Sequence, residues 1–140
     1  MVTIKIAVSP WLIFLPHLPA GIEFVCLQKD ISQAEAHLLS QRPEILRFDQ
    51  DIHTFSDTAA LCQITDLVVS VDTSVAHLSA ALGKKTILLL PLNQDWRWLL
   101  KRTDSPWYHN VELIRQVKVR DWGNVFSELN ARLVLQASKA

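Results

Sequence analysis

The sequence predicts an α/β fold, a Rossmann-like parallel sheet with helices on both faces, because strand-like and helix-like segments alternate along it. Short runs rich in Val, Ile and Leu have the length and β-branched content typical of strands. Two of these runs, LVVSV and TILLL, are apolar at successive positions, as strands buried on both faces must be. Regular alternation of strand and helix favours a parallel sheet with helices on both sides.

The individual elements follow from local patterns. The expected strands are TIKIAV (3–8), IEFVCL (22–27), EILRF (44–48), DLVVSV (66–71), KTILLLP (85–91) and VELIR (111–115). The expected helices are Ser32–Gln41, with Ala34, Leu38 and Leu39 on one face, Ser56–Ile64, Ser74–Leu82 and Trp122–Ala137. Ser56 and Asp57 are N-cap candidates for the second helix, and Gly83 is placed to end the third.

Composition and charge narrow the class of protein. Apolar residues make up 49% of the chain and charged residues 20%, a balance typical of a folded globular protein. At 140 residues the chain is long enough for one domain, so we expect residues 1–140 to form a single unit. Acidic and basic residues both total 14, and no basic stripe is present, so nucleic acid is not an expected partner.

Metal, disulfide and cofactor chemistry have little support. Cys26 and Cys62 lie in apolar runs without CxxC spacing, so we expect small buried side chains and neither a disulfide nor a zinc site. The histidines are scattered, and neither a G-x-G-x-x-G nor a P-loop motif occurs among only three glycines. The serines lack a G-x-S-x-G elbow. We therefore expect no bound metal and no cofactor.

The N-terminal segment 1–20 loosely imitates a signal peptide, because one lysine precedes an apolar run that ends near LPA. Pro10, Pro16 and Pro19 interrupt the run, and a continuous helix would break there. The run is also shorter than the roughly 20 apolar residues that span a bilayer. We expect no membrane span and a cytoplasmic location.

A polar corner follows the DLVVSV run, where Asp72, Thr73 and Ser74 stand at the change from strand to helix. Ligands of open parallel sheets bind beyond the carboxyl ends of the strands. Unpaired N–H groups at the helix start, with short hydroxyl side chains, can cradle a diphosphate. We expect His77, one turn later, to point into the same crevice. In the simpler alternative, the corner only caps the helix and His77 is a structural histidine.

Two longer stretches carry a family resemblance. FSDTAALCQITDLVVSVDTSVAHLSAALGKKTILLLP and DWRWLLKRTDSPWY resemble the C-terminal part of bacterial tetratricopeptide-repeat proteins with a glycosyltransferase domain related to the ADP-heptose:lipopolysaccharide heptosyltransferases. The similarity covers residues 21–133 and leaves 1–20 as a divergent segment. It implies the C-terminal half of a GT-B glycosyltransferase, a Rossmann-like domain that binds a nucleotide diphosphate or nucleotide sugar.

The resemblance also implies site residues. Asp72, Thr73 and Ser74 match the family's D-[ST]-G-type donor loop, with Ser74 where glycine is usual, and His77 matches its histidine. Further residues that would edge the cleft are Gln28, Lys29, Asp95, Trp96 and Arg97. Simpler alternatives exist. A lysine such as Lys29 is also typical of an exposed loop, and the tryptophans are also typical of a core packed around a long loop.

The resemblance implies a domain that binds the donor but is inactive alone, because a GT-B enzyme holds its acceptor in the N-terminal half. The alternative is a non-catalytic interaction module that docks on a partner or on itself through an apolar N-terminal patch. Trp11, Ile13 and Phe14 would form that patch. A third hypothesis is a complete small enzyme whose acid or base is His77, His109 or Asp95.

Overall fold

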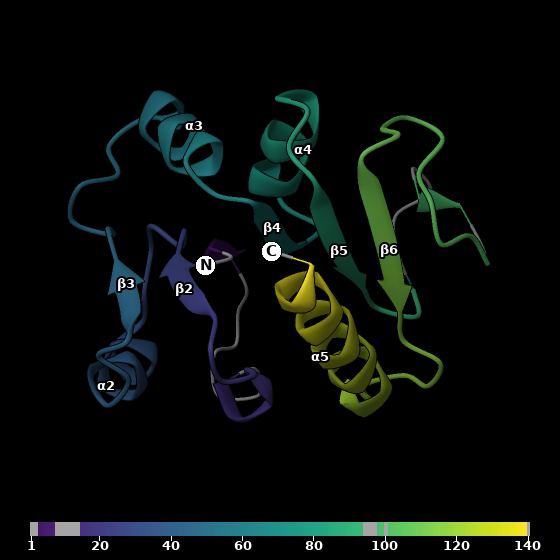
Figure 1. Cartoon of the computed structure of the whole chain (residues 1–140), viewed down its shortest axis with the longest axis horizontal. Helices are drawn as coiled ribbons and strands as arrows, with labels where there is room; N and C mark the ends of the chain where they lie inside the picture. The colour runs from purple at the N-terminus through teal and green to yellow at the C-terminus, as the bar shows by residue number, and fades with distance from the viewer. Residues whose placement is uncertain (1–2, 8–14, 94–97, 100, 140) are drawn as a thin grey trace.

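The computed structural model describes residues 3–7, 15–93, 98–99 and 101–139. Within them a parallel sheet runs in the order β3-β2-β1-β4-β5-β6 (Figure 1). The strands are β1 (Thr3–Ala7), β2 (Glu23–Cys26), β3 (Ile45–Arg47), β4 (Leu67–Val71), β5 (Thr86–Leu90) and β6 (Val111–Arg115). Each predicted strand is confirmed to within one residue at its ends.

Helices cover both faces of the sheet, as the sequence predicts. They are α2 (Gln33–Ser40), α3 (Phe55–Gln63), α4 (Ser74–Ala81) and α5 (Gly123–Ser138), and a short 3-10 turn, η1, spans Leu15–His17. Figure 1 shows α3 and α4 on one side of the sheet and α2 and α5 on the other. In the described part of the chain, no helix combines the length and apolar character that crossing a bilayer requires.

The core has two sides because successive strand residues point to opposite faces. On β4, Leu67 and Val69 join the large cluster that includes residues of α5, whereas Val68 packs with Cys62 of α3. Both cysteines are buried, as predicted, and burial raises the pKa of the Cys26 thiol to about 11. This thiol therefore stays protonated and packs as a small hydrophobe.

The helix ends agree with the predicted positions, but one cap differs. Gly83 follows α4 with φ of +77°, the left-handed conformation that glycine adopts without steric cost. For α3 the N-cap is Thr54 rather than Ser56 or Asp57. Asp57 instead occupies the third helical position, where its carboxylate accepts hydrogen bonds from the N–H groups of His53 and Thr54, both at 2.9 Å.

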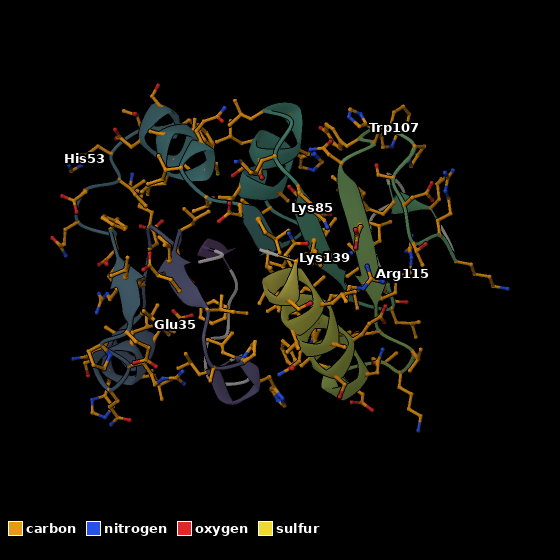
Figure 2. The ribbon with its side chains drawn as sticks, viewed as in Figure 1. Glu35, His53, Lys85, Trp107, Arg115 and Lys139 are labelled. Atoms are coloured by element: carbon orange, nitrogen blue, oxygen red, sulfur yellow. The ribbon has the colours of Figure 1, made fainter. Side chains whose placement is uncertain are left out.

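The connection from β5 to β6 contains no α-helix among its described residues, so side chains of a loop cover this part of the sheet. Trp98 is only 1% exposed and packs with Ala76 and Leu88 in the cluster beneath α4. The guanidinium of Arg115 fastens the loop by donating to the carbonyl oxygens of Trp98 and Arg102. Figure 2 labels Arg115 on β6 beside this connection.

Candidate functional site

A cavity of about 580 Å³ lies at the carboxyl ends of β2 and β4. The strand order reverses between β1 and β4, and such a switch point is where open α/β sheets bind ligands. The polar lining residues are Gln28, Lys29, Asp30, His53, Thr54, Thr58, Thr73 and Ser74, and the apolar ones are Leu27, Ile52, Phe55, Val71 and Val75. Three connections that follow β2, β3 and β4 therefore meet at one hollow.

The structure brings four residues of the predicted site together in one cavity. Thr73 and Ser74 share the cavity with Gln28 and Lys29, although more than forty residues separate the two pairs in sequence. Asp72 and His77 are not among the described residues that line this cavity, so their part in ligand binding stays a prediction. The predicted cleft residues Asp95, Trp96 and Arg97 lie outside the described residues.

The first turn of α4 is open toward the cavity. Thr73 is its N-cap in extended conformation, but the Thr73 side chain makes no cap hydrogen bond and the first turn contains no acidic residue. The Thr73 hydroxyl instead lies 3.2 Å from the Ser70 hydroxyl. In the described part of the chain no acceptor takes the N–H groups of Ser74 and Val75. The positive end of this helix is therefore available to an anion.

Two helices that begin at the same edge of the sheet as α4, namely α2 and α3, are closed by acidic side chains. Asp57 accepts the N–H groups before α3, and Glu35 accepts the Ser32 N–H before α2 at 3.0 Å. The hydrogen bonds from His53 and Thr54 lower the pKa of Asp57, so its negative charge persists to acidic pH. These carboxylates offset the helix dipoles of α2 and α3, whereas α4 and α5 have no acidic residue in their first turns.

Glu35 was not predicted, because the sequence pattern placed Ala34 on one face of α2 with Leu38 and Leu39. Ala34 is exposed, whereas Glu35 is buried with 7% of its surface exposed. Its carboxylate accepts hydrogen bonds from the Ser32 hydroxyl at 2.8 Å and from Gln28 Nε2 at 3.3 Å. Glu35 thereby fixes Gln28 at the cavity wall, and the S-x-x-E capping box at Ser32 was the signal that could have revealed it.

The apolar wall of the cavity was also missed. Ile52 is 3% exposed and forms the base of this wall, whereas Phe55 is 63% exposed at its rim. His53 stands between them in sequence, and Figure 2 labels it on the loop before α3. The available signal was positional, because residues between a strand and the next helix of a parallel sheet lie at the carboxyl edge.

Asp72 and His77 belong to a second cluster under the β5–β6 connection. His77 Nε2 lies 3.4 Å from Asp72 Oδ1, and His77 Nδ1 lies 3.3 Å from the Tyr108 hydroxyl. The imidazole stacks on Trp98 with ring centroids 5.3 Å apart. Trp98 therefore fills core as the simpler alternative proposed, while Trp107 is 60% exposed and Figure 2 shows it at the outside of the connection.

Metal binding has no visible basis in the described residues, where no three His, Cys, Asp or Glu side chains gather in a ligating arrangement. The chemistry that the cavity offers is instead that of a partly apolar hollow with hydroxyls, one lysine and open backbone N–H groups. Such a set of groups suits a ligand with an anionic part and an apolar ring.

The sheet and its flanking helices define a Rossmann-like α/β fold with a cavity at the carboxyl edge of the sheet. Residues 53–120 match the family model of glycosyltransferase family 9 (heptosyltransferase). The matched stretch begins at the cavity rim, contains α3, β4, α4, β5 and β6, and includes Thr73 and Ser74. No curated protein matches the chain. The match and the fold together indicate a glycosyltransferase-like domain.

Proposed function

We propose that this domain binds the diphosphate of a nucleotide sugar, as the donor-binding C-terminal half of a GT-B glycosyltransferase akin to those of tetratricopeptide-repeat proteins. The observation that carries the proposal is the uncapped first turn of α4, which opens on the same cavity as Lys29. The match of residues 53–120 supports it independently, because that stretch contains the whole of α4.

The diphosphate would lie against the start of α4. The N–H groups of Ser74 and Val75 would donate to its oxygens, and the hydroxyls of Thr73 and Ser74 would complete the cradle. Lys29, in the β2–α2 connection, lines the same cavity and would add one positive charge. Ser74 carries a Cβ where glycine is usual in heptosyltransferases, so the phosphate would sit slightly farther from the backbone.

The nucleoside would lie against the apolar part of the cavity lining. Ile52, Val75 and the exposed ring of Phe55 offer an apolar surface for a base. A volume of about 580 Å³ falls within the range of pockets that enclose small ligands, about 300–1,000 Å³. The nature of the base would depend on backbone contacts in the loop before α3.

In a complete enzyme the bound donor would react by glycosyl transfer through an oxocarbenium-like transition state. The dipole of α4 and the charge of Lys29 would stabilise the leaving diphosphate without an obligatory metal. The acceptor would be held by a second Rossmann-like half. We therefore propose that the 140-residue chain binds the donor in the cytoplasm and does not turn it over alone. Nucleotide released from nucleotide sugars in the presence of acceptors would contradict the second part.

The deciding experiment is a titration of isotope-labelled protein with ADP, UDP, GDP, CDP and TDP, observed through backbone amide signals. We expect one nucleotide to shift the amides of Thr73, Ser74 and Val75 saturably, together with that of Lys29. The matching nucleoside without phosphates serves as the control, and it should leave the amides of α4 in place. If none of the diphosphates shifts these amides at millimolar concentration, the donor site is refuted and the interaction module gains support.

A further inference from the structure

We propose that His77 holds the carboxylate of Asp72 away from the first turn of α4, and that Tyr108 fixes His77 in the form that does so. His77 and Tyr108 are then positioning residues, because both act on a bound anion only through the Asp72 carboxylate. The inference rests on the proposed function, because the open turn that it protects is the proposed diphosphate site. It concerns side chains that do not line the cavity themselves.

An aspartate at this position would ordinarily close the helix end. Aspartate side chains readily accept a hydrogen bond from the N–H group two residues ahead, which for Asp72 is that of Ser74. The positive end of the helix dipole would favour the same placement. An Asp72 carboxylate there would occupy one of the two open N–H groups and would repel an anionic ligand from the other.

The structure places the carboxylate elsewhere. Its Oδ1 atom lies 3.4 Å from Nε2 of His77, the fourth residue of α4. No hydrogen bond joins Asp72 to the N–H groups of Ser74 or Val75 in the part of the chain that the structure describes. The imidazole of His77 thus offers the carboxylate a partner on the side of α4 that faces the β5–β6 connection.

Tyr108 sets the orientation of that imidazole and determines which of its two nitrogens carries the hydrogen. Its hydroxyl lies 3.3 Å from Nδ1 of His77, and the ring is further held by its stack on Trp98. When the Tyr108 O–H donates to Nδ1, the ring hydrogen is on Nε2, which faces Asp72. Tyr108 is itself fixed, because its N–H donates to the Ser105 hydroxyl oxygen at 3.2 Å. On this proposal a chain of donation leads from the Tyr108 hydroxyl to Nδ1 of His77, whose Nε2 lies 3.4 Å from Oδ1 of Asp72.

A first test needs no nucleotide. In the protein alone, the ¹⁵N shifts of the His77 ring should report the form with the hydrogen on Nε2, and Tyr108→Phe should reduce its population. His77→Phe keeps an aromatic ring against Trp98 but removes both nitrogens. In this variant we expect the Ser74 amide to exchange with solvent several-fold more slowly, because Asp72 now accepts from it. An unchanged exchange rate in a folded His77→Phe protein would overturn the inference.

A second test measures ADP affinity, or that of whichever diphosphate binds the wild type. His77→Phe should weaken binding about three- to tenfold, the size of a charge effect at a helix end. Adding Asp72→Asn should restore wild-type affinity, because the competing charge is gone. If His77→Phe weakens ADP binding and the added Asp72→Asn does not restore it, His77 contacts the phosphate directly, which contradicts the inference. His37→Phe, at an exposed position of α2, is the matched control and should bind as wild type does.

The two tests separate the inference from the proposed function. If the wild type binds no diphosphate, the proposed function fails, and the ring ¹⁵N shifts with the Ser74 exchange rate still decide whether His77 restrains Asp72. If His77→Phe does not fold, Tyr108→Phe supplies the same comparison, because it removes a single hydroxyl. Like His77→Phe, it should make the Ser74 amide exchange more slowly than in the wild type. Faster or unchanged exchange would count against the chain of donation.

Discussion

The imidazole ring of His77 stacks on the indole ring of Trp98, with centroids 5.3 Å apart and an interplanar angle of 27°. This contact joins the first turn of α4 to the connection between β5 and β6. The described part of that connection contains no α-helix, so the indole supplies apolar cover that a helix would otherwise provide. One tryptophan therefore stabilises both the sheet face and the side of α4 that lies away from the cavity.

The first prediction concerns this tryptophan. Trp98→Ala should lower the free energy of unfolding by about 3–5 kcal/mol, because it leaves a large cavity in a packed cluster. Trp107→Ala is the matched control, since Trp107 is 60% exposed. It should change stability by no more than about 0.5 kcal/mol. Urea unfolding followed by circular dichroism measures both, and equal losses would contradict the assignment of Trp98 to the core.

The second prediction concerns Lys29. Lys29→Ala should weaken nucleoside diphosphate binding about fivefold, the effect of one exposed charge contact worth about 1 kcal/mol. The loss should shrink as salt is raised, because added ions already screen the attraction in the wild type. Lys139→Ala removes an exposed lysine after α5 and should leave affinity unchanged. Calorimetric titration at two salt concentrations tests this, and equal effects of both variants would place Lys29 outside the site.

The third prediction uses the size of the side chain at the start of α4. Ser74→Leu should reduce diphosphate binding at least about tenfold, because a branched side chain would fill the space before the open N–H groups. Ser56→Leu makes the same change at an exposed position near the start of α3 and should bind normally. The melting temperatures of both variants should remain close to that of the wild type. Normal binding by Ser74→Leu would show that the ligand does not approach α4.

The fourth prediction concerns acid stability. Hydrogen bonds from the N–H groups of His53 and Thr54 lower the pKa of Asp57 below its ordinary value of 3.8. A lowered folded-state pKa means that this stabilisation is fully present above pH 3.8 and is lost as the pH falls through the folded value. Asp57→Asn should therefore be less stable than wild type at neutral pH, and the difference should shrink toward pH 2. A difference that stays constant from pH 7 to pH 2 would contradict this role.

Much of the fold could be predicted from the sequence because local patterns determine it. Runs such as TILLL at Thr86–Leu90 can be buried only in a strand covered on both faces, and Gly83 supplies the positive φ that ends α4. The cap of α3 was misplaced by two residues, since Thr54 and Ser56 are equally suitable by residue type. Only the backbone path into the helix selects Thr54.

The candidate site was predictable only in part. The sequence by itself determined that Thr73 and Ser74 stand at a strand-to-helix corner, since strand and helix patterns meet there. Tertiary structure alone decided that these residues share a cavity with Lys29 while His77 turns toward Trp98 and Tyr108. The physical reason is that successive residues of a helix's first turn point in different directions. Their partners come from strands and loops far away in the chain, so packing, rather than local pattern, selects what each side chain meets.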